Sequence, residues 1–246
     1  MRHKIDFQAG LSLVELLIAL VVSAFLILGV TQIYIDNKSS YLAQQAVGEL
    51  QGNSRFALRF LEQLIMKAGY KSLPQDSREM AFPALVAQGG CPSFAAGQVV
   101  GVTSSGKGVC LRYQRRSVGE LDCLGAPISV SAAITTKIEL SSNGELLCSA
   151  QGSASQAMFS GVSDLQIVLG VDLNSDRIVD AYIANPTVGS VVSVRMAFLQ
   201  RSDNTNVALG KQDYNFPLSS AASTTAVDKR VYRSTQSTFT VRNYAQ

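Results

Sequence analysis

The sequence predicts an α+β protein in which one long N-terminal helix, transmembrane in its first half and amphipathic in its second, packs on an antiparallel β-sheet domain. Two observations support this fold class. Apolar residues fill positions 11–35 almost without interruption and then recur at helical spacing to Ala68, with no proline before Pro74. After Pro74 the spacing of apolar residues changes to two, which is typical of strands.

The apolar run is long enough to cross a membrane. Residues 11–30 contain a single charge, at Glu15. A helix of about 20 residues spans about 30 Å, the thickness of the hydrocarbon core. The short leader that ends at Gly10 carries Arg2 and Lys4, and positive charge stays on the cytoplasmic side. We therefore expect the body of the chain to lie on the opposite side of the membrane.

Beyond the run, the helix continues with one apolar stripe made of two adjacent rows. The rows are Phe56, Phe60 and Leu64, and Ala57, Leu61 and Ile65. Gly69 is expected to cap the helix, with Pro74 shortly after it. The expected segments are a leader at 1–10, a membrane or filament-core helix at 11–35, its amphipathic continuation at 36–70 and a β-rich globular domain at 71–246.

Strands are expected throughout the globular domain. The clearest covers 192–198, where buried and exposed residues should alternate so that one face of the strand is buried. Asn143 and Gly144 predict a hairpin turn. Residues 202–227, rich in Ser, Thr, Asn and Ala, predict a long surface loop. The other expected strands are 99–102, 109–114, 137–140, 146–148, 165–171 and 239–242.

The residues GLSLVE, from Gly10 to Glu15, with the basic leader before them and the apolar run behind, resemble the class III signal of type IV pilins and pseudopilins. The resemblance implies that a prepilin peptidase cuts after Gly10 and methylates the new amino terminus at Leu11. It also implies that Glu15 neutralises the Leu11 ammonium of a neighbouring subunit and so sets the register of a filament. The alternative is that Glu15 only snorkels to the membrane interface.

Residues 53–70, NSRFALRFLEQLIMKAGY, resemble the same segment of PilW-type minor pilins. The resemblance implies a pilin-like fold and a minor pilin of the pilus initiation and tip complex, which promotes assembly and presents a tip adhesin. Implied partners are the other minor pilins, the major pilin, the large adhesin and the prepilin peptidase. The implied location is the bacterial inner membrane, crossed once with the C-terminal domain in the periplasm, and the pilus tip after assembly.

Two alternatives remain open at this point. One is a minor pseudopilin of type II secretion. The other is a DNA-binding minor pilin of natural uptake, suggested by the basic and aromatic residues from Arg112 to Arg116. A net charge of +3 is small for a nucleic-acid binder, so nucleic acid is not expected as a partner and these arginines are interpreted as a solvated strand end.

An enzyme is not expected. The only histidine is His3, which leaves no His-based acid, base or metal ligand in the body of the chain. The sequence from Gly101 to Lys107 fits G-x-x-x-x-G-K, but Gly108 replaces the Ser or Thr that would hold Mg²⁺, and a strand is expected after it.

The four cysteines are expected to form disulfides, because they lack the close pair typical of zinc sites and the periplasm is oxidising. Four cysteines allow three connectivities. We favour Cys91 with Cys110 and Cys123 with Cys148, since neighbours in sequence close the shorter loops across adjacent strands.

Oxygen-bearing residues alternate between two expected strands. Asp172, Asn174, Asp176 and Asp180 occupy positions 1, 3, 5 and 9 of a calcium loop of the EF-hand type, and Ile178 offers its carbonyl at position 7. Arg177 stands where glycine is usual, and Ile183 stands where a bidentate Glu is usual. We expect weak calcium binding here, with an acidic turn as the alternative.

Overall fold

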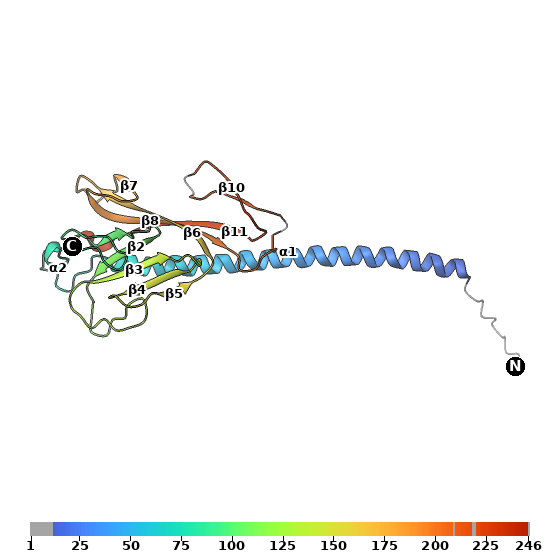
Figure 1. Cartoon of the computed structure of the whole chain (residues 1–246), viewed down its shortest axis with the longest axis horizontal. Coiled ribbons are helices and arrows are strands. Elements are labelled where there is room, and N and C mark those ends of the chain that lie inside the picture. The colour runs from blue at the N-terminus through green and yellow to red at the C-terminus, as the bar shows by residue number, and fades with distance from the viewer. Residues whose placement is uncertain (1–11, 209, 218–219, 246) are drawn as a thin grey trace, which may run out of the picture. The chain divides into compact units, whose positions relative to one another are not determined.

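The computed structural model describes residues 12–208, 210–217 and 220–245. The chain divides into two compact units, residues 1–45 and residues 46–246. Helix α1, Leu13–Lys67, is continuous and contributes to both units (Figure 1). Gly10 and Leu11, the predicted processing residues, lie outside the described residues.

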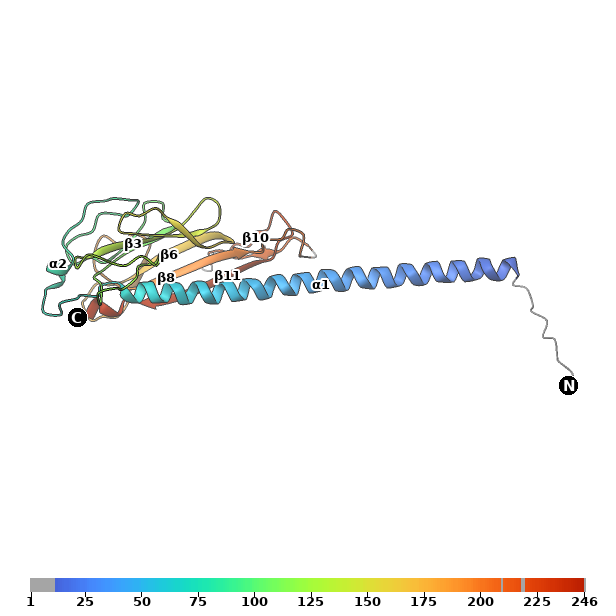
Figure 2. The same cartoon turned by 90° about the horizontal axis from the view of Figure 1, so that it is seen from below.

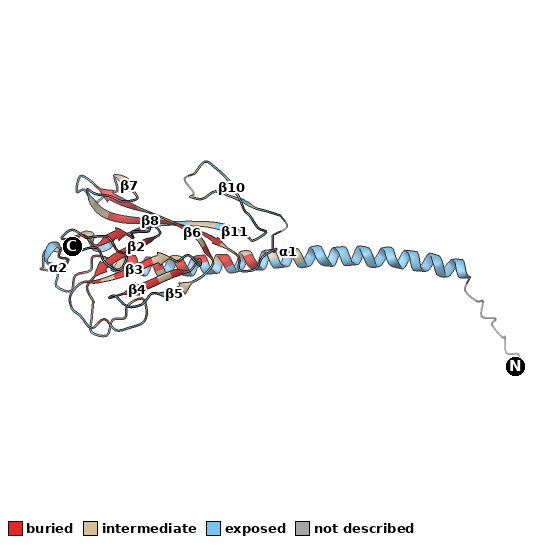
Figure 3. Ribbon diagram, viewed as in Figure 1, coloured by how far each residue is buried: buried red, intermediate tan, exposed pale blue. Residues whose placement is uncertain are grey.

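The described part of the first unit is the N-terminal half of α1, and its side chains are exposed from Ser12 to Lys38 (Figure 3). The hydroxyl groups of Ser23 and Thr31 donate to carbonyls one turn back, at 3.0 and 2.7 Å, so these polar groups are satisfied within the helix. By length and composition this helix can cross a membrane.

In the second unit, the C-terminal half of α1 forms part of the core. Ala57, Leu61, Leu64 and Ile65 are buried, as expected, but the prediction for Phe56 is wrong because this side chain is 58% exposed. Successive residues are rotated by about 100° around a helix, so a stripe centred on Leu61 faces the core without including Phe56. The Phe56 ring stacks instead on Phe60, with 6.4 Å between centroids.

The end of α1 confirms the predicted cap. Gly69 has φ of +77°, the left-handed conformation that favours glycine, and its N–H donates to the Arg112 carbonyl at 2.9 Å. The side-chain amide of Asn243 donates to the carbonyls of Met66 at 2.8 Å and Ala68 at 3.2 Å. The helix end is therefore joined both to Arg112 and to Asn243, which lie far from it in the sequence.

The first sheet is an antiparallel meander with strand order β1-β2-β3-β4-β5. Its strands are β1 (Val100–Val102), β2 (Gly108–Tyr113), β3 (Ile134–Leu140), β4 (Leu146–Ala150) and β5 (Gln156–Phe159). The predicted hairpin joins β3 to β4, with Gly144 at φ of +79°. Short helix α2, Arg78–Ala81, precedes this sheet.

The second sheet has strand order β11-β8-β6-β7, and all its pairs are antiparallel. Its strands are β6 (Val162–Asp172), β7 (Ala181–Ile183), β8 (Ser190–Arg201) and β11 (Tyr232–Thr240), and the 3-10 helix η1, Arg242–Ala245, follows. Figure 2 shows β8 and β11 beside the C-terminal half of α1, where the Thr235 hydroxyl donates to the Ser54 hydroxyl at 3.3 Å. The main core contains residues of α1 and of both sheets.

Three sequence predictions for this region need correction. The strand expected at 239–242 begins at Tyr232 and ends at Thr240, because an edge strand rich in Ser, Thr and Gln lacks the apolar alternation that marks a half-buried strand. The expected loop at 202–227 contains β9 (Asp213–Tyr214) paired with β10 (Thr224–Thr225), and its Val207 packs with Leu50 of α1.

The third correction concerns β8, which is not buried on one face only. Val194, Met196 and Phe198 are buried as predicted, but Ser193 and Ala197 on the opposite face are buried too. These two side chains are short and lie in a central strand between β6 and β11, so the larger neighbouring side chains cover them.

Both favoured disulfides are present. Cys91–Cys110 joins the segment before β1 to β2, and Cys123–Cys148 joins the β2–β3 connection to β4. In each pair only one cysteine lies in a strand. The bridges therefore fasten connecting segments to the sheet, whereas the sequence predicted that they would link adjacent strands.

Candidate functional site

The first turn of α1 places Glu15 at the third helical position after Ser12. The Glu15 carboxylate accepts the backbone N–H of Ser12 at 3.2 Å, which is one half of a capping box of the form S-x-x-E. The sequence analysis missed this local role, although the spacing of the two residues signals it. The contact of Glu15 with a neighbouring amino terminus stays a prediction.

The helix surface that follows Glu15 is apolar on every side. Large side chains from Leu13 to Ile35 are more than half exposed, among them Phe25 at 71% and Val30 at 67%. A soluble monomer rarely exposes a continuous apolar surface of this size, because burial of such a surface is favourable. This part of the helix therefore requires a lipid or protein environment.

The predicted calcium loop begins at Asp172, the buried last residue of β6. Its carboxylate accepts the backbone N–H groups of Asn174 at 3.2 Å, Ser175 at 2.7 Å and Arg177 at 2.8 Å. Burial by itself raises the pKa of this carboxyl group, but the backbone donors outweigh burial and hold the pKa below its usual value. Asp172 is thus the ionised acceptor around which the loop folds.

The other predicted ligands lie in the same loop and also accept backbone donors. Asp180 accepts the N–H of Leu173 at 2.7 Å, and Asp176 accepts the N–H of Ile178 at 2.7 Å. The Asn174 side-chain amide donates to Asp176 at 3.2 Å. In the described part of the chain, no group of three or more His, Cys, Asp or Glu side chains is arranged to hold a metal ion. This geometry fits an acidic turn, and calcium binding stays a prediction.

The basic run from Arg112 to Arg116, which begins in β2, does not form one exposed surface. Arg112 is only 3% exposed, and it donates to the carbonyls of Gln98 at 3.1 Å and Pro83 at 2.8 Å. The prediction that Arg112 is solvated is therefore wrong. Val109 and Leu111 face the main core, so Arg112 lies on the opposite face of β2, where its guanidinium is 5.8 and 5.3 Å from the centres of the Phe82 and Phe94 rings. Arg116 remains exposed, with its guanidinium 5.7 Å from the centre of the Tyr70 ring.

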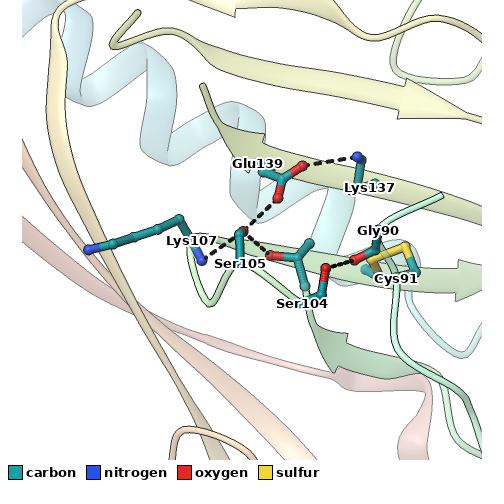
Figure 4. Close-up of polar contacts among 9 residues, drawn as sticks. Gly90, Cys91, Ser104, Ser105, Lys107, Lys137 and Glu139 are labelled. Atoms are coloured by element: carbon teal, nitrogen blue, oxygen red, sulfur yellow. Dashed lines mark hydrogen bonds and ion pairs between the residues drawn. A yellow bond between two sulfur atoms is a disulfide. The ribbon is translucent and has the colours of Figure 1, made fainter. Parts of the chain in front are cut away.

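The sequence that resembles a phosphate-binding loop is the turn of the β1–β2 hairpin, so a strand follows it as expected. Figure 4 shows that Ser105 in this turn points toward Glu139, to which its hydroxyl donates at 2.6 Å, while Lys107 extends away from both. Lys107 forms an ion pair with Asp164 of β6, and Lys137 pairs with Glu139 at 2.9 Å. Burial alone raises the pKa of Glu139, but the bonds from the Ser105 hydroxyl and the Lys137 ammonium lower it overall.

Residues 130–243 match the family model of PilW, described as type IV pilus-assembly protein W. Residues 6–31 match the prokaryotic N-terminal methylation motif. No curated protein matches the chain significantly. Among solved structures, a type IV-like pilin from Thermus thermophilus is similar at a TM-score of 0.48 and 14% identity, over 80% of this chain and 98% of that chain.

The methylation motif, the long N-terminal helix and the antiparallel sheets are the features of a type IV pilin-like protein. Within that class, the match to PilW supports a minor pilin of the PilW type. The class III signal and the PilW resemblance are thus confirmed. The PilW match lies in β3 to β11 and not in the helix end at 53–70, on which the sequence resemblance rested.

Proposed function

We propose that the chain is a non-enzymatic minor pilin of the type IV pilus initiation and tip complex, which promotes pilus assembly and presents a tip adhesin. The observation that carries the proposal is the combination of a methylation motif at 6–31 with an apolar helix surface that overlaps it, whose large side chains from Leu13 to Ile35 are more than half exposed. Such a helix can be held in the inner membrane before assembly and then be buried among other pilin helices in the filament.

The remaining roles follow from this arrangement. The prepilin peptidase removes the leader after Gly10, Glu15 meets the new ammonium group of a neighbouring subunit, and the folded unit offers its surfaces to other minor pilins, the major pilin and the adhesin. A minor pseudopilin of type II secretion would share the signal and the helix, and the PilW match favours the pilus.

The burial of Arg112 weighs against the alternative of DNA uptake. Only Arg115 and Arg116 of the basic run retain access to solvent, and the Arg115 guanidinium donates to the carbonyls of Ile128 and Ser129 at 3.2 and 3.1 Å. Too few free cations remain to neutralise several phosphates.

Processing provides a direct test. We expect Gly10→Trp to block removal of the leader, which leaves about ten extra residues detectable by mass, because the peptidase site cannot accept a large side chain next to the cut. Ala9→Ser is the control and should be processed normally. Deletion of the gene should sharply reduce surface pili, whereas normal piliation with defective protein secretion would support the pseudopilin.

We further propose that the loop from Asp172 to Asp180 binds calcium. Supporting this, Ser175 and Arg177 adopt φ of +66° and +69°, so Arg177 supplies the left-handed turn that glycine usually supplies at position 6. Asp172, Asn174, Asp176, the Ile178 carbonyl and Asp180 would hold the ion. Millimolar calcium should then raise the Tm of the protein by several degrees, in line with a Kd of about 10⁻⁴ M or weaker.

The control for the calcium experiment is Asp176→Asn, which keeps an acceptor for the turn but removes a carboxylate from the predicted ligand set. This variant should fold and show a smaller calcium shift. An equal shift in the variant, or the same shift with magnesium, would contradict a specific calcium site.

A further inference from the structure

Strand β11 forms one edge of the second sheet, and its outward-facing backbone groups can be identified from the pairing. The N–H of Ser202 donates to the carbonyl of Val231, and the N–H of Val241 donates to the carbonyl of Val192, each at 2.9 Å. Hydrogen-bonded pairs alternate along an antiparallel ladder. The odd-numbered residues of β11 therefore bond to β8, and the even-numbered residues direct their N–H and C=O groups away from the sheet.

These outward groups are free along most of the strand. The N–H of Tyr232 donates to the Gln212 side chain at 3.0 Å. The backbone groups of the next even residues have no hydrogen-bond partner among the described residues, and all but the first of these residues are exposed. They are Ser234, Gln236, Thr238 and Thr240.

The edge lacks most of the features that usually prevent strand addition, and its one charged residue is Arg233. Natural edges are protected by shortness, proline, lysine or a bulge. The other edge strands of the two larger sheets, β1, β5 and β7, have 3, 4 and 3 residues. By contrast, β11 has 9 residues, pairs with β8 in unbroken register and contains neither proline nor lysine.

We propose that the free edge of β11 is a docking site for an extended acidic segment of a partner protein, which adds to the sheet as another strand. Backbone hydrogen bonds to the even-numbered residues would supply affinity, as in other cases of strand addition. The identification of this partner as a pilus component rests on the proposed function. The docking site itself rests only on the free backbone groups of β11.

Charge favours an acidic partner. The sequence from 229 to 242 contains four cations, Lys229, Arg230, Arg233 and Arg242, and no Asp or Glu. Asp228 lies just before this stretch and already pairs with Arg230 at 3.3 Å. Acidic side chains on an added strand would therefore meet cations at both ends of the edge.

The same charges disfavour a second copy of this chain. Self-pairing of two β11 strands would bring Arg233 and Arg242 of both copies to one seam, and residues 229–242 contain no Asp or Glu that could offset them. Like charges gathered along such a seam destabilise the pairing of the strands. The acidic segment is thus the occupant that this edge fits best.

The test uses the full chain in detergent micelles and a nine-residue capped peptide in which valine alternates with threonine and glutamate. We expect the peptide to slow hydrogen exchange at the amides of Ser234, Gln236, Thr238 and Thr240, while the odd-numbered amides are already protected by β8. A peptide with lysine in place of glutamate should bind at least about tenfold more weakly. Equal binding of the two peptides would overturn the acidic partner.

Variants test the backbone contact itself. Gln236→Pro removes an outward N–H but no bond to β8, so it should weaken peptide binding about tenfold or more, since proline is tolerated at a strand edge. Gln236→Ala keeps the N–H and should bind normally. Two further peptides carry N-methyl groups on alternate backbone amides, one on the odd-numbered and one on the even-numbered positions. Only the peptide whose methylated amides face β11 should lose binding, and this comparison tests the contact without altering the protein.

Several results would overturn the proposal. They are unchanged exchange at the even-numbered amides with the acidic peptide, equal binding by the proline and alanine variants, and protection that appears with protein concentration alone, which would indicate a second copy. The proposed function fails separately: normal piliation after gene deletion contradicts it without affecting peptide binding.

Discussion

Replacement of Glu15 by alanine is expected to leave a folded, membrane-bound protein that is almost absent from assembled pili. Glu15 lies in the first turn of α1, and in the described residues its side chain contacts only the start of its own helix. The folded unit, residues 46–246, does not depend on it. In the membrane, an unpaired carboxylate costs at least about 2.5 kcal/mol, and pairing with an ammonium group of a neighbouring subunit in the filament removes that cost.

A second substitution separates the two roles of Glu15. Glu15→Gln keeps the acceptor for the Ser12 N–H, because Gln also serves in a capping box, but it removes the charge. If charge pairing directs assembly, Gln and Ala should reduce incorporation alike, as measured by the amount of the protein in sheared pili. Normal incorporation of the Gln variant would show that only the cap matters.

The control for both Glu15 variants is Glu62→Ala on the same helix. Glu62 forms an exposed ion pair with Arg59 at 3.0 Å, and such pairs contribute little to stability. This variant should fold and be incorporated normally. Its loss from pili would indicate that any acid on α1 affects assembly.

Removal of the Cys123–Cys148 disulfide is expected to cost about 3 kcal/mol of folding free energy in the chain-entropy model, for a loop with a sequence separation of 25. Both cysteines are buried in the main core, so the Cys123→Ala, Cys148→Ala double variant also loses packing there. Thermal unfolding of the purified chain should show a clear fall in Tm.

The matched control is wild-type protein unfolded with and without a reducing agent, compared with the double variant. Reduction should lower the Tm of the wild type by more than that of the variant, which retains only Cys91–Cys110. Non-reducing peptide maps that join Cys91 to Cys148 would contradict the connectivity, and an unchanged Tm in the double variant would contradict the stabilising role.

Local patterns in the sequence predicted most of the fold. The spacing around Leu61 and the glycine at Gly69 placed the helix and its end, because helical periodicity and capping depend on residues close in the chain. The hairpin at Gly144 and strand β8 were predicted for the same reason. Strand β11 was largely missed, since its side chains lack an apolar alternation and its pairing partner β8 lies about 40 residues earlier.

The site shows the same division. The prepilin signal, the exposed apolar helix and the acidic residues of the Asp172 loop are continuous stretches that the sequence alone determined. Only the tertiary structure decided that Arg112 is buried and that β11 has a free edge, because burial and strand pairing depend on which distant segments meet. The sequence of a basic run does not show whether its side chains face solvent or are buried, and the sequence of a Ser/Thr-rich segment does not show whether it pairs as a strand. Long-range packing decides both.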